Sequence, residues 1–181
     1  MKTIGTILRT GVLAGLLALA AVSAYGSGAY TPLPPRPPAK ADAPMAGKDK
    51  MMKMLVNVDA SGVALAGHDP VAFFTAGKPM PGRPEFSFTY AGANYRFASA
   101  ENLAKFRADP ARYAPQFGGF CAYGVAHGQL APVEVTAFVV VDGRLLMQSN
   151  AAIRDQFKQD EMGNLKMADT KWPGLVNSKG K

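Results

Sequence analysis

The residues best suited to chemistry lie in one glycine-rich stretch, GGFCAYGVAHG, residues 118–128. It contains Cys121, the only cysteine of the chain, and His127, one of two histidines. The other histidine, His68, stands directly before Asp69. A thiolate and two imidazoles are ligands that suit copper or zinc. We therefore predict a metal site formed by Cys121, His68 and His127, with copper as the first candidate and zinc as the second.

Three other interpretations of these residues stay open. Cys121 can be a small buried side chain, since cysteine is among the most often buried residue types. It can be a nucleophile with a histidine as its base and Asp69 orienting that histidine, although no nucleophile-elbow motif is present. A hydrophobic cradle can also hold a small ligand, with Tyr95, Arg96 and Tyr123 at its mouth and Asp69 completing the ligand-binding set. We expect a protein that is not an enzyme.

The beginning of the chain has the pattern of an export signal. Lys2 and Arg9 precede an apolar run over residues 11–22, and small residues follow at Val22-Ser23-Ala24. The run is shorter than the roughly 20 apolar residues that span a membrane. We predict a signal peptide over residues 1–24, cleaved after Ala24, and a periplasmic or secreted protein without a transmembrane span in the mature chain. An uncleaved signal that stays as an anchor is the alternative.

Composition narrows the choice of partner. The formal net charge is +7 with the basic residues scattered along the chain, and no arginine-rich helix or alternation of basic and aromatic residues is present. We therefore expect no nucleic acid, and either a metal ion or an envelope protein as partner. A single cysteine cannot form a disulfide within the chain. Residues 25–54 are rich in proline and are predicted to be an extended tether.

The positions of turn and cap residues indicate the elements that must hold these side chains. Residues 55–67 read as two short strands around a turn, and residues 68–77 as a short helix that starts after Asp69. Residues 86–98 form a predicted hairpin. Ser99 and then Asp109 start two helices, which end near Arg107 and at Tyr113.

The second half shows a similar mixture of elements. Residues 133–149 are a predicted hairpin with Asp142-Gly143 at its tip. Asn150 starts a helix that is expected to run to about Asp160 and to be ended by Gly163, and a last helix over residues 164–172 is expected to stop at Pro173. No internal repeat is visible. The predicted fold class is α+β, with short antiparallel hairpins packed against several short helices in one domain over residues 55–175, followed by a basic tail over residues 176–181.

Three stretches, HDPVAFF, YRFASAENLAKFRADPARY and GGFCAYGVAHG, resemble the YHS domain family, and most of all its exported members with an extended C-terminal half. The resemblance implies a core similar to a treble clef and, in many members, a metal bound by cysteines. The corresponding positions here hold Ala72, Ala98 and Asn102, so the cysteine site of those members is absent.

The sequence therefore leads to one expectation with two alternatives. We expect an exported small binding or accessory domain with a soft metal near Cys121. The first alternative is an envelope protein-protein interaction module in which Cys121 is purely structural, and the second is a thiol-dependent enzyme.

Overall fold

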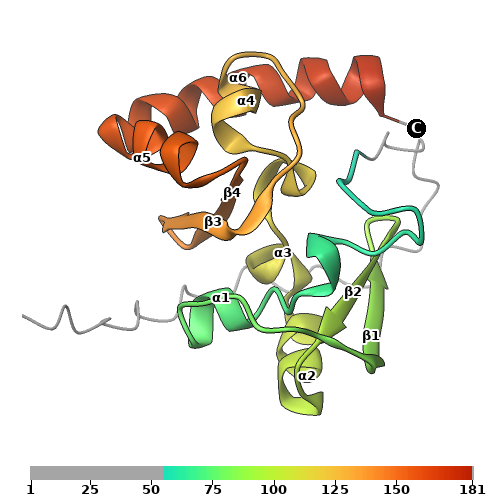
Figure 1. Ribbon diagram of the computed structural model, residues 1–181. Coiled ribbons are helices and arrows are strands. Elements are labelled where there is room, and N and C mark those ends of the chain that lie inside the picture. The colour runs from blue at the N-terminus through green and yellow to red at the C-terminus, as the bar shows by residue number, and fades with distance from the viewer. Residues whose placement is uncertain (1–54, 181) are drawn as a thin grey trace, which may run out of the picture. The chain divides into compact units, whose positions relative to one another are not determined.

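The structure is a computed structural model that describes residues 55–180. The predicted signal peptide, residues 1–24, and the predicted tether, residues 25–54, lie outside the described residues. The described part is α+β, as predicted, with two separate two-stranded antiparallel sheets and a set of mostly short helices (Figure 1). In chain order the elements are η1 (Leu65–Gly67), α1 (Ala72–Thr75), β1 (Arg83–Tyr90), β2 (Ala93–Phe97), α2 (Ala100–Ala108), α3 (Pro110–Tyr113), η2 (Gln116–Gly119), α4 (Ala122–Ala126), β3 (Glu134–Val141), β4 (Arg144–Gln148), α5 (Ala151–Gln159) and α6 (Glu161–Lys179).

The segment before the first sheet follows the prediction in part. Gly62 turns the chain with a φ of 77°, but the two strands expected around it reduce to a single bridge between Val58 and Ala64. The short helix after Asp69 is present as α1, and Gly77 follows it with a φ of 64°. Glycine adopts a positive φ at little cost, which suits the end of this helix.

The first hairpin is confirmed. Ala91 and Gly92 connect β1 to β2 with φ values of 54° and 78°. Two left-handed central residues match the twist of the flanking strands, as in a type I′ turn. Phe86, Phe88 and Tyr90 of β1 are partly buried against one apolar cluster, so this strand places its aromatic face inward.

Polar caps set the starts of α2 and α3, as the sequence indicated. The Ser99 side chain accepts the backbone N–H of Asn102 at 3.2 Å, and Asp109 accepts that of Arg112 at 3.2 Å. Each bond satisfies an amide that has no partner within its own helix. The caps fix where α2 starts, and Phe106 of α2 is fully buried.

The second hairpin and the helix after it are also confirmed. Asp142 and Gly143 connect β3 to β4 with φ values of 49° and 71°. Asn150 then caps α5 by accepting the backbone N–H of Ile153 at 2.9 Å. Within residues 55–180, no helix is both long and apolar enough to cross a membrane.

The helix that starts at Asn150 ends near Asp160 as predicted, but both predicted stop residues, Gly163 and Pro173, are wrong. Gly163 does not end a helix, because the break falls at Asp160, whose carboxylate accepts the Gly163 backbone N–H at 2.9 Å and starts α6. A Cβ at position 163 would collide with that carboxylate. Pro173 does not stop α6 either, although it lacks the N–H of a helical bond. Trp172 and Leu175 on both sides of it pack against an apolar cluster. The predicted domain end at residue 175 falls inside α6.

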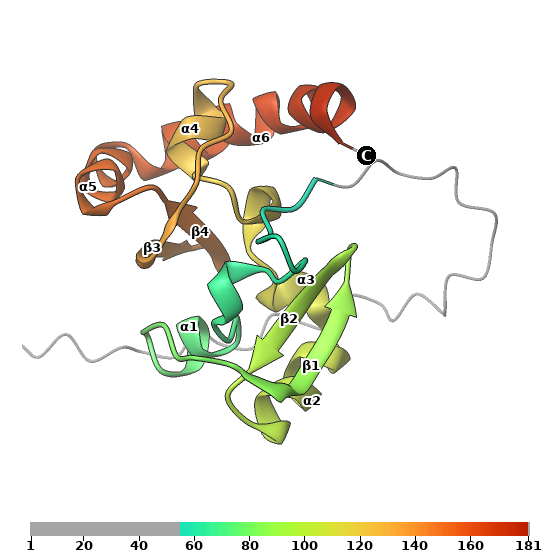
Figure 2. The same ribbon diagram turned by 45° about the vertical axis from the view of Figure 1, so that its right-hand side comes forward.

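The second half of the described chain repeats the backbone of the first half, so the expectation of no internal repeat is wrong. Each half contains, in order, a three-residue left-handed turn, a short helix, a strand of 8 residues, a two-residue left-handed turn, a strand of 5 residues and a helix of 9 residues. We call residues 65–110 the first repeat and residues 117–161 the second repeat. Figure 2 shows both hairpins, each followed by its helix.

The correspondence extends to the register of the two sheets, including a shift at the same place in each. The equivalent strand partners are Arg83↔Phe97 and Glu134↔Gln148, Ser87↔Arg96 and Phe138↔Met147, Phe88↔Tyr95 and Val139↔Leu146, Thr89↔Asn94 and Val140↔Leu145, and Tyr90↔Ala93 and Val141↔Arg144. Few equivalent side chains are identical, but those that are include Gly92 and Gly143, Phe106 and Phe157, and Asp109 and Asp160. The repeat is therefore plain in the backbone and faint in the sequence.

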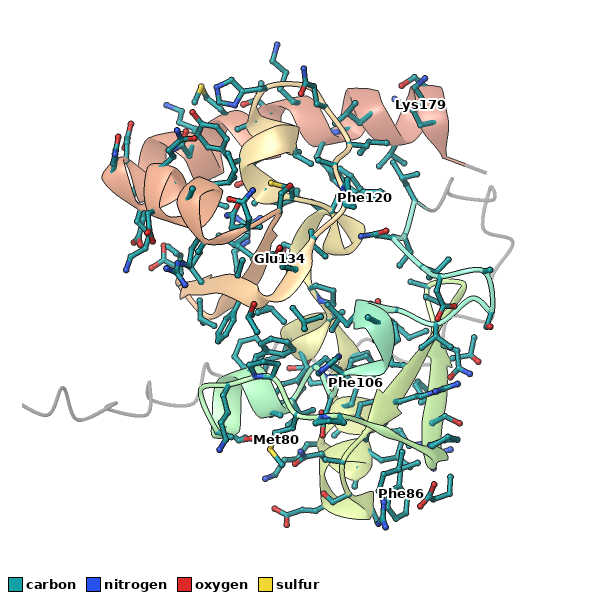
Figure 3. The ribbon with its side chains drawn as sticks, in the orientation of Figure 1. Met80, Phe86, Phe106, Phe120, Glu134 and Lys179 are labelled. Atoms are coloured by element: carbon teal, nitrogen blue, oxygen red, sulfur yellow. The ribbon has the colours of Figure 1, made fainter. Side chains whose placement is uncertain are left out.

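Each repeat has an apolar cluster of its own. Phe106 belongs to the first cluster and Phe157 to the second, and neither side chain has exposed surface. In Figure 3, Phe106 lies on α2 beside the first hairpin. The same residue type at the same step of the pattern thus anchors a helix to a hairpin in both repeats.

A third apolar cluster joins the two repeats. It contains Leu65 and Phe73 from the first repeat and Leu145 and Met147 from the second. The Phe73 ring meets the Phe138 ring edge to face, with centroids 4.8 Å apart. Such aromatic pairs add about 0.5–1.5 kcal/mol beyond the burial of their area. The repeats therefore share a core.

Candidate functional site

Cys121 lies at the start of α4, where it is 1% exposed. Its Sγ accepts the backbone N–H of Gly124 at 3.4 Å and donates to Oε1 of Gln148 at 3.4 Å. The same Oε1 accepts the backbone N–H of Tyr123 at 3.2 Å. A Cβ at position 124 would stand 3.2 Å from the carbonyl oxygen of Gln129, so glycine lets the chain pass closely here. The chain thus makes a tight turn around the sulfur.

The amide nitrogen of Gln148 has no hydrogen-bond partner. Gln148 is fully buried at the end of β4, and among residues 55–180 its Nε2 is the buried side-chain nitrogen or oxygen without a partner. Exchanging the amide oxygen and nitrogen would not help, because Nε2 would then face the Tyr123 N–H and two donors would meet. An unpaired buried donor costs about 1–3 kcal/mol. Buried donors are normally paired, so an acceptor is expected beside this amide nitrogen.

The two histidines do not join Cys121. The Nδ1 of His68 lies 3.2 Å from the carbonyl oxygen of Leu65, and the Nδ1 of His127 lies 2.8 Å from that of Tyr123. A carbonyl oxygen only accepts, so both bonds need the proton on Nδ1. Within the described residues, no three or more His, Cys, Asp or Glu side chains form a group that could hold a metal ion. The predicted ligand set is therefore not assembled.

The helix between Cys121 and His127 explains why these two residues are apart. Cys121 stands at the N-terminal end of α4 and His127 at its C-terminal end. Six residues of helix advance by about 9 Å. His127 is exposed and its ring packs on Tyr123, with centroids 4.4 Å apart, whereas Cys121 faces the core. A short spacing in sequence thus does not produce proximity here.

Asp69 is a structural residue rather than a ligand-binding one. It is fully buried, and its carboxylate accepts four donors. These donors are the backbone N–H groups of Val71 at 2.8 Å, Ala72 at 3.4 Å and Ala98 at 2.8 Å, and the side-chain amide of Asn102 at 2.7 Å. The carboxylate joins the start of α1 to the end of β2 and to α2.

The donors to Asp69 show whether this chain could bind the metal ion that the family resemblance implied. Ala72, Ala98 and Asn102 stand at the positions of the cysteines in the metal-binding members, and here all three donate to Asp69. Amide N–H donors and alanine side chains do not bind a metal ion. The residues of the first repeat therefore do not fit that metal, and a carboxylate cross-links the same elements instead.

The predicted mouth of a ligand cradle is not formed. Tyr95 is 2% exposed in the cluster of the first repeat, where its ring contacts Phe106. Tyr123 packs on the cluster of the second repeat, and Arg96 is half-buried on β2. Burial raises the pKa of Tyr95 well above its usual value, and the nearby Tyr90 raises it further.

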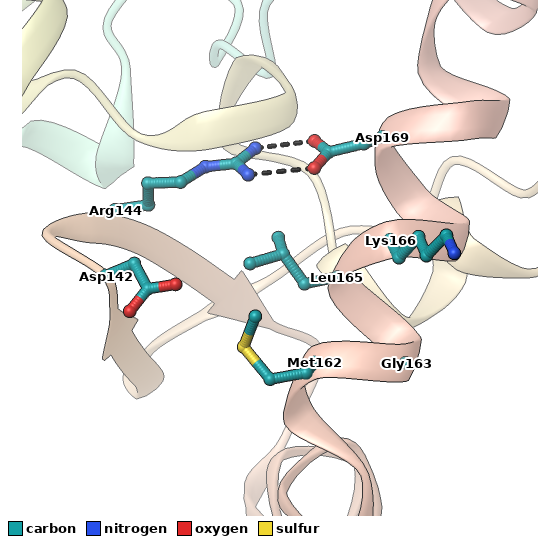
Figure 4. Close-up of a pocket in the computed structure, with 7 residues that line it drawn as sticks. All are labelled: Asp142, Arg144, Met162, Gly163, Leu165, Lys166 and Asp169. Atoms are coloured by element: carbon teal, nitrogen blue, oxygen red, sulfur yellow. Dashed lines mark hydrogen bonds and ion pairs between the residues drawn. The ribbon is translucent and has the colours of Figure 1, made fainter.

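A surface hollow lies elsewhere, between the second hairpin and α6. Its volume is about 500 Å³, and Figure 4 shows its lining. Arg144 and Asp169 form a two-point ion pair across it, with N–O distances of 2.9 and 2.6 Å. The bonds to Asp169 raise the pKa of Arg144. The residues around the hollow are Asp142, Arg144, Met162, Gly163, Leu165, Lys166 and Asp169.

Sequence reasoning missed Gln148 and the residues of this hollow. Gln148 ends an apolar strand, RLLMQ, and a lone amide after such a run was the available signal. Nothing local connects Arg144 to Asp169, because the second hairpin and α6 are separated in the chain by α5. Both features depend on tertiary packing.

A comparison with protein-family models finds the YHS domain over residues 71–117. No curated protein and no solved structure matches the chain. The matched segment covers most of the first repeat and ends at Phe117, so nearly all of the second repeat lies outside it. Of the three stretches that suggested the family in the sequence, YRFASAENLAKFRADPARY lies within the match, HDPVAFF overlaps its start, and GGFCAYGVAHG lies outside it. The family-model match over residues 71–117 therefore agrees with the family resemblance seen in the sequence.

Proposed function

We propose that this chain is an exported accessory protein that is not an enzyme, and that it acts by binding an envelope protein through its folded surface. One observation carries the proposal. Cys121, His68, His127 and Asp69, the reactive side chains that the sequence singled out, are each hydrogen-bonded to the fold itself. Side chains engaged in this way stabilise a scaffold, and a scaffold acts through its surface.

The hollow beside α6 is the proposed contact surface. Met162 at its edge is 59% exposed, and Met167 on the same helix is 44% exposed. Methionine side chains are flexible and polarisable, and they recur at protein-binding surfaces that adapt to a partner. Leu165 supplies an apolar floor, while Lys166 and the Arg144–Asp169 pair supply polar edges. This combination suits an apolar side chain of a protein partner with polar groups around it.

Export is the second part of the proposal and rests on the signal-like residues 1–24. It places the protein among envelope proteins, which makes one of them the expected partner. Fractionation of cells that express the full chain, with intact-mass analysis of the product, tests this part. We expect an envelope or secreted product that begins at Tyr25.

Crosslinking from one position tests the contact surface. A photoreactive amino acid at position 162, in the full chain and its native host, is expected to give one discrete adduct. The same amino acid at exposed Lys158 of α5 is the matched control and is expected to give none. Met162→Glu should abolish co-purification of the adduct partner without changing thermal stability. Equal adducts at both positions, or unchanged co-purification, would contradict the proposal.

Copper or zinc at Cys121, the first expectation from sequence, is not part of the proposal. The thiol proton bonds Gln148, and both histidines bond carbonyl oxygens of their own segments. Titration of the folded protein with Cu(I) and Zn(II) provides the check, with Cys121→Ser as the control. Uptake of one equivalent that Cys121→Ser removes would overturn this position and restore the metal-binding function.

A further inference from the structure

Asp69 and Cys121 occupy equivalent positions in the two repeats. Each follows the left-handed turn, and each donates its backbone N–H to a carbonyl oxygen three residues before the next hairpin, Asp69 to Met80 at 2.9 Å and Cys121 to Ala131 at 3.2 Å. Each side chain also accepts the backbone N–H of the third residue after it. The two side chains therefore lie in the same kind of socket at a helix start.

The two sockets differ in how well they are filled. In the first repeat, two carboxylate oxygens accept four donors. In the second repeat, the Gly124 N–H donates to the single sulfur of Cys121, while the thiol proton and the Tyr123 N–H both go to Oε1 of Gln148. Sulfur is a weak acceptor. The Nε2 of Gln148, fully buried on a side chain that contacts this sulfur, is left without any partner.

We propose that Cys121 is an oxidation site, at which hydrogen peroxide converts the thiol to a sulfinate held by the Gln148 amide and the first N–H groups of α4. A sulfinate carries two oxygens on the atom attached to Cβ, and it is negatively charged at neutral pH. An aspartate carboxylate has the same arrangement. Oxidation would therefore give the second repeat the acceptor that Asp69 provides in the first.

The chemistry needs only peroxide as co-reactant. In the first step the sulfur attacks one peroxide oxygen, the O–O bond breaks, an S–O bond forms, and the thiol becomes a sulfenic acid with release of water. A second peroxide adds another oxygen in the same way, and the sulfinic acid then loses its proton. Each step oxidises sulfur by two electrons and reduces one peroxide. Because Cys121 is 1% exposed, the reaction waits for local opening and is slower than that of a free cysteine.

Peroxide treatment of the folded chain, residues 25–181, tests the reaction. We expect a gain of about 32 Da on the peptide that contains Cys121, not reversed by dithiothreitol, with an unchanged circular dichroism spectrum. The oxidised protein should melt within about 3 °C of the reduced protein. In Gln148→Leu, the oxidised form should melt at least about 10 °C below its own reduced form. A thiol that stays unmodified, or oxidation that lowers the melting temperature equally in both proteins, overturns the proposal.

A second variant tests the socket without any oxidant. Cys121→Asp places a carboxylate in the position of the sulfinate, and we expect it to melt within about 3 °C of the wild type. Val125→Asp is the matched control, since Val125 is fully buried in the same helix and its side chain packs in an apolar cluster. This control should lose at least about 10 °C or fail to fold. If Cys121→Asp is as damaging as Val125→Asp, the proposal fails and the Gln148 amide marks a buried water only.

Discussion

The Asp69 carboxylate forms its hydrogen bonds within the fold. It contacts Ala72, Ala98 and Asn102, the positions where metal-binding members have cysteines, so a carboxylate joins these elements here. The carboxylate links α1, the end of β2 and α2 through donors that lie up to 33 positions away in the chain. A buried carboxylate is stable only when it is fully hydrogen-bonded. The same requirement makes it a strong and specific connection between elements.

The removal of this carboxylate should destabilise the protein strongly. Asp69→Ala leaves the buried N–H of Val71 and the half-buried Ala98 N–H and Asn102 amide without the acceptor that they share. We expect a loss of at least about 3 kcal/mol in the free energy of unfolding. Urea denaturation followed by circular dichroism measures it. Asp155→Ala, at an exposed position, should cost less than about 0.5 kcal/mol, and similar losses for both variants would refute the role of Asp69.

Tyr95 gives a prediction on pH. Burial and the nearby Tyr90 raise its pKa in the folded protein, so the folded state holds the phenol proton while the unfolded state releases it near pH 10. This contribution to stability is complete below pH 10 and is lost as pH rises further. In Tyr95→Phe the stability should fall less steeply between pH 10 and about 11.5. Equal slopes in denaturation curves of the two proteins would show that Tyr95 does not control alkaline unfolding.

Residue-scale prediction from sequence worked where the cause is local. Ser99, Asp109 and Asn150 cap the helices that they were expected to cap, because a cap bonds an amide within three residues. The tight turn around Cys121 also follows from nearby glycines. Gln148, by contrast, contacts Cys121 from another element, and no local pattern contains that information.

At the scale of elements, the two hairpins are the most regular parts of the molecule. Both use a two-residue left-handed turn, but Asp142 is well suited to a positive φ and Ala91 is not. A residue with a Cβ costs roughly 1–2 kcal/mol in this conformation, and Asn or Asp tolerates it better through local hydrogen bonds. The first hairpin thus contains a strained position that the second has avoided.

Ala91→Asn should therefore stabilise the protein. We expect a gain of about 0.5–1 kcal/mol, since Asn-Gly is the preferred sequence of a type I′ turn. The equivalent change in the second repeat, Asp142→Asn, should leave stability within about 0.3 kcal/mol. Thermal melts of both variants make the comparison. A loss of stability in Ala91→Asn would mean that the turn is held by contacts rather than by its own preference.

Element-scale prediction failed at Gly163 and Pro173, and for a physical reason. Both residue types break helices when nothing else acts on the chain. Here Asp160 caps the new helix at Gly163, and Trp172 and Leu175 hold the segment around Pro173 against a core. Tertiary packing of α6 outweighs the local preference of two residues.

At the scale of the whole molecule, the described chain is a structural duplication with a shared core. The repeat is hard to detect in the sequence because its two copies agree in backbone angles and burial more than in residue type. Equivalent positions hold Asp69 and Cys121, or Phe97 and Gln148. Phe106 and Phe157 were the clearest signal, since the same residue type stands at the same position of the 9-residue helix in each repeat. Both side chains are fully buried.

The shared core predicts that both repeats unfold together. Phe73→Ala removes a ring that packs on Phe138 of the other repeat, and it should cost about 3–5 kcal/mol. Hydrogen exchange should then increase in β4 as well as in β2, and Trp172 fluorescence and circular dichroism should report one transition. Phe86→Ala, in the first repeat only and partly buried, should cost less. Loss of protection confined to the first repeat would show that the repeats unfold independently.

Phe117 is the last residue of the matched YHS segment, yet its ring packs inside the second repeat, 5.8 Å from the ring of Trp172. The limit set by family similarity and the limit set by packing therefore do not coincide. A fragment cut at position 117 would bare this ring to water together with Leu65 and Phe73. Such a fragment should associate with itself, and any binding measured on it would describe an exposed interior rather than the surface of the intact protein.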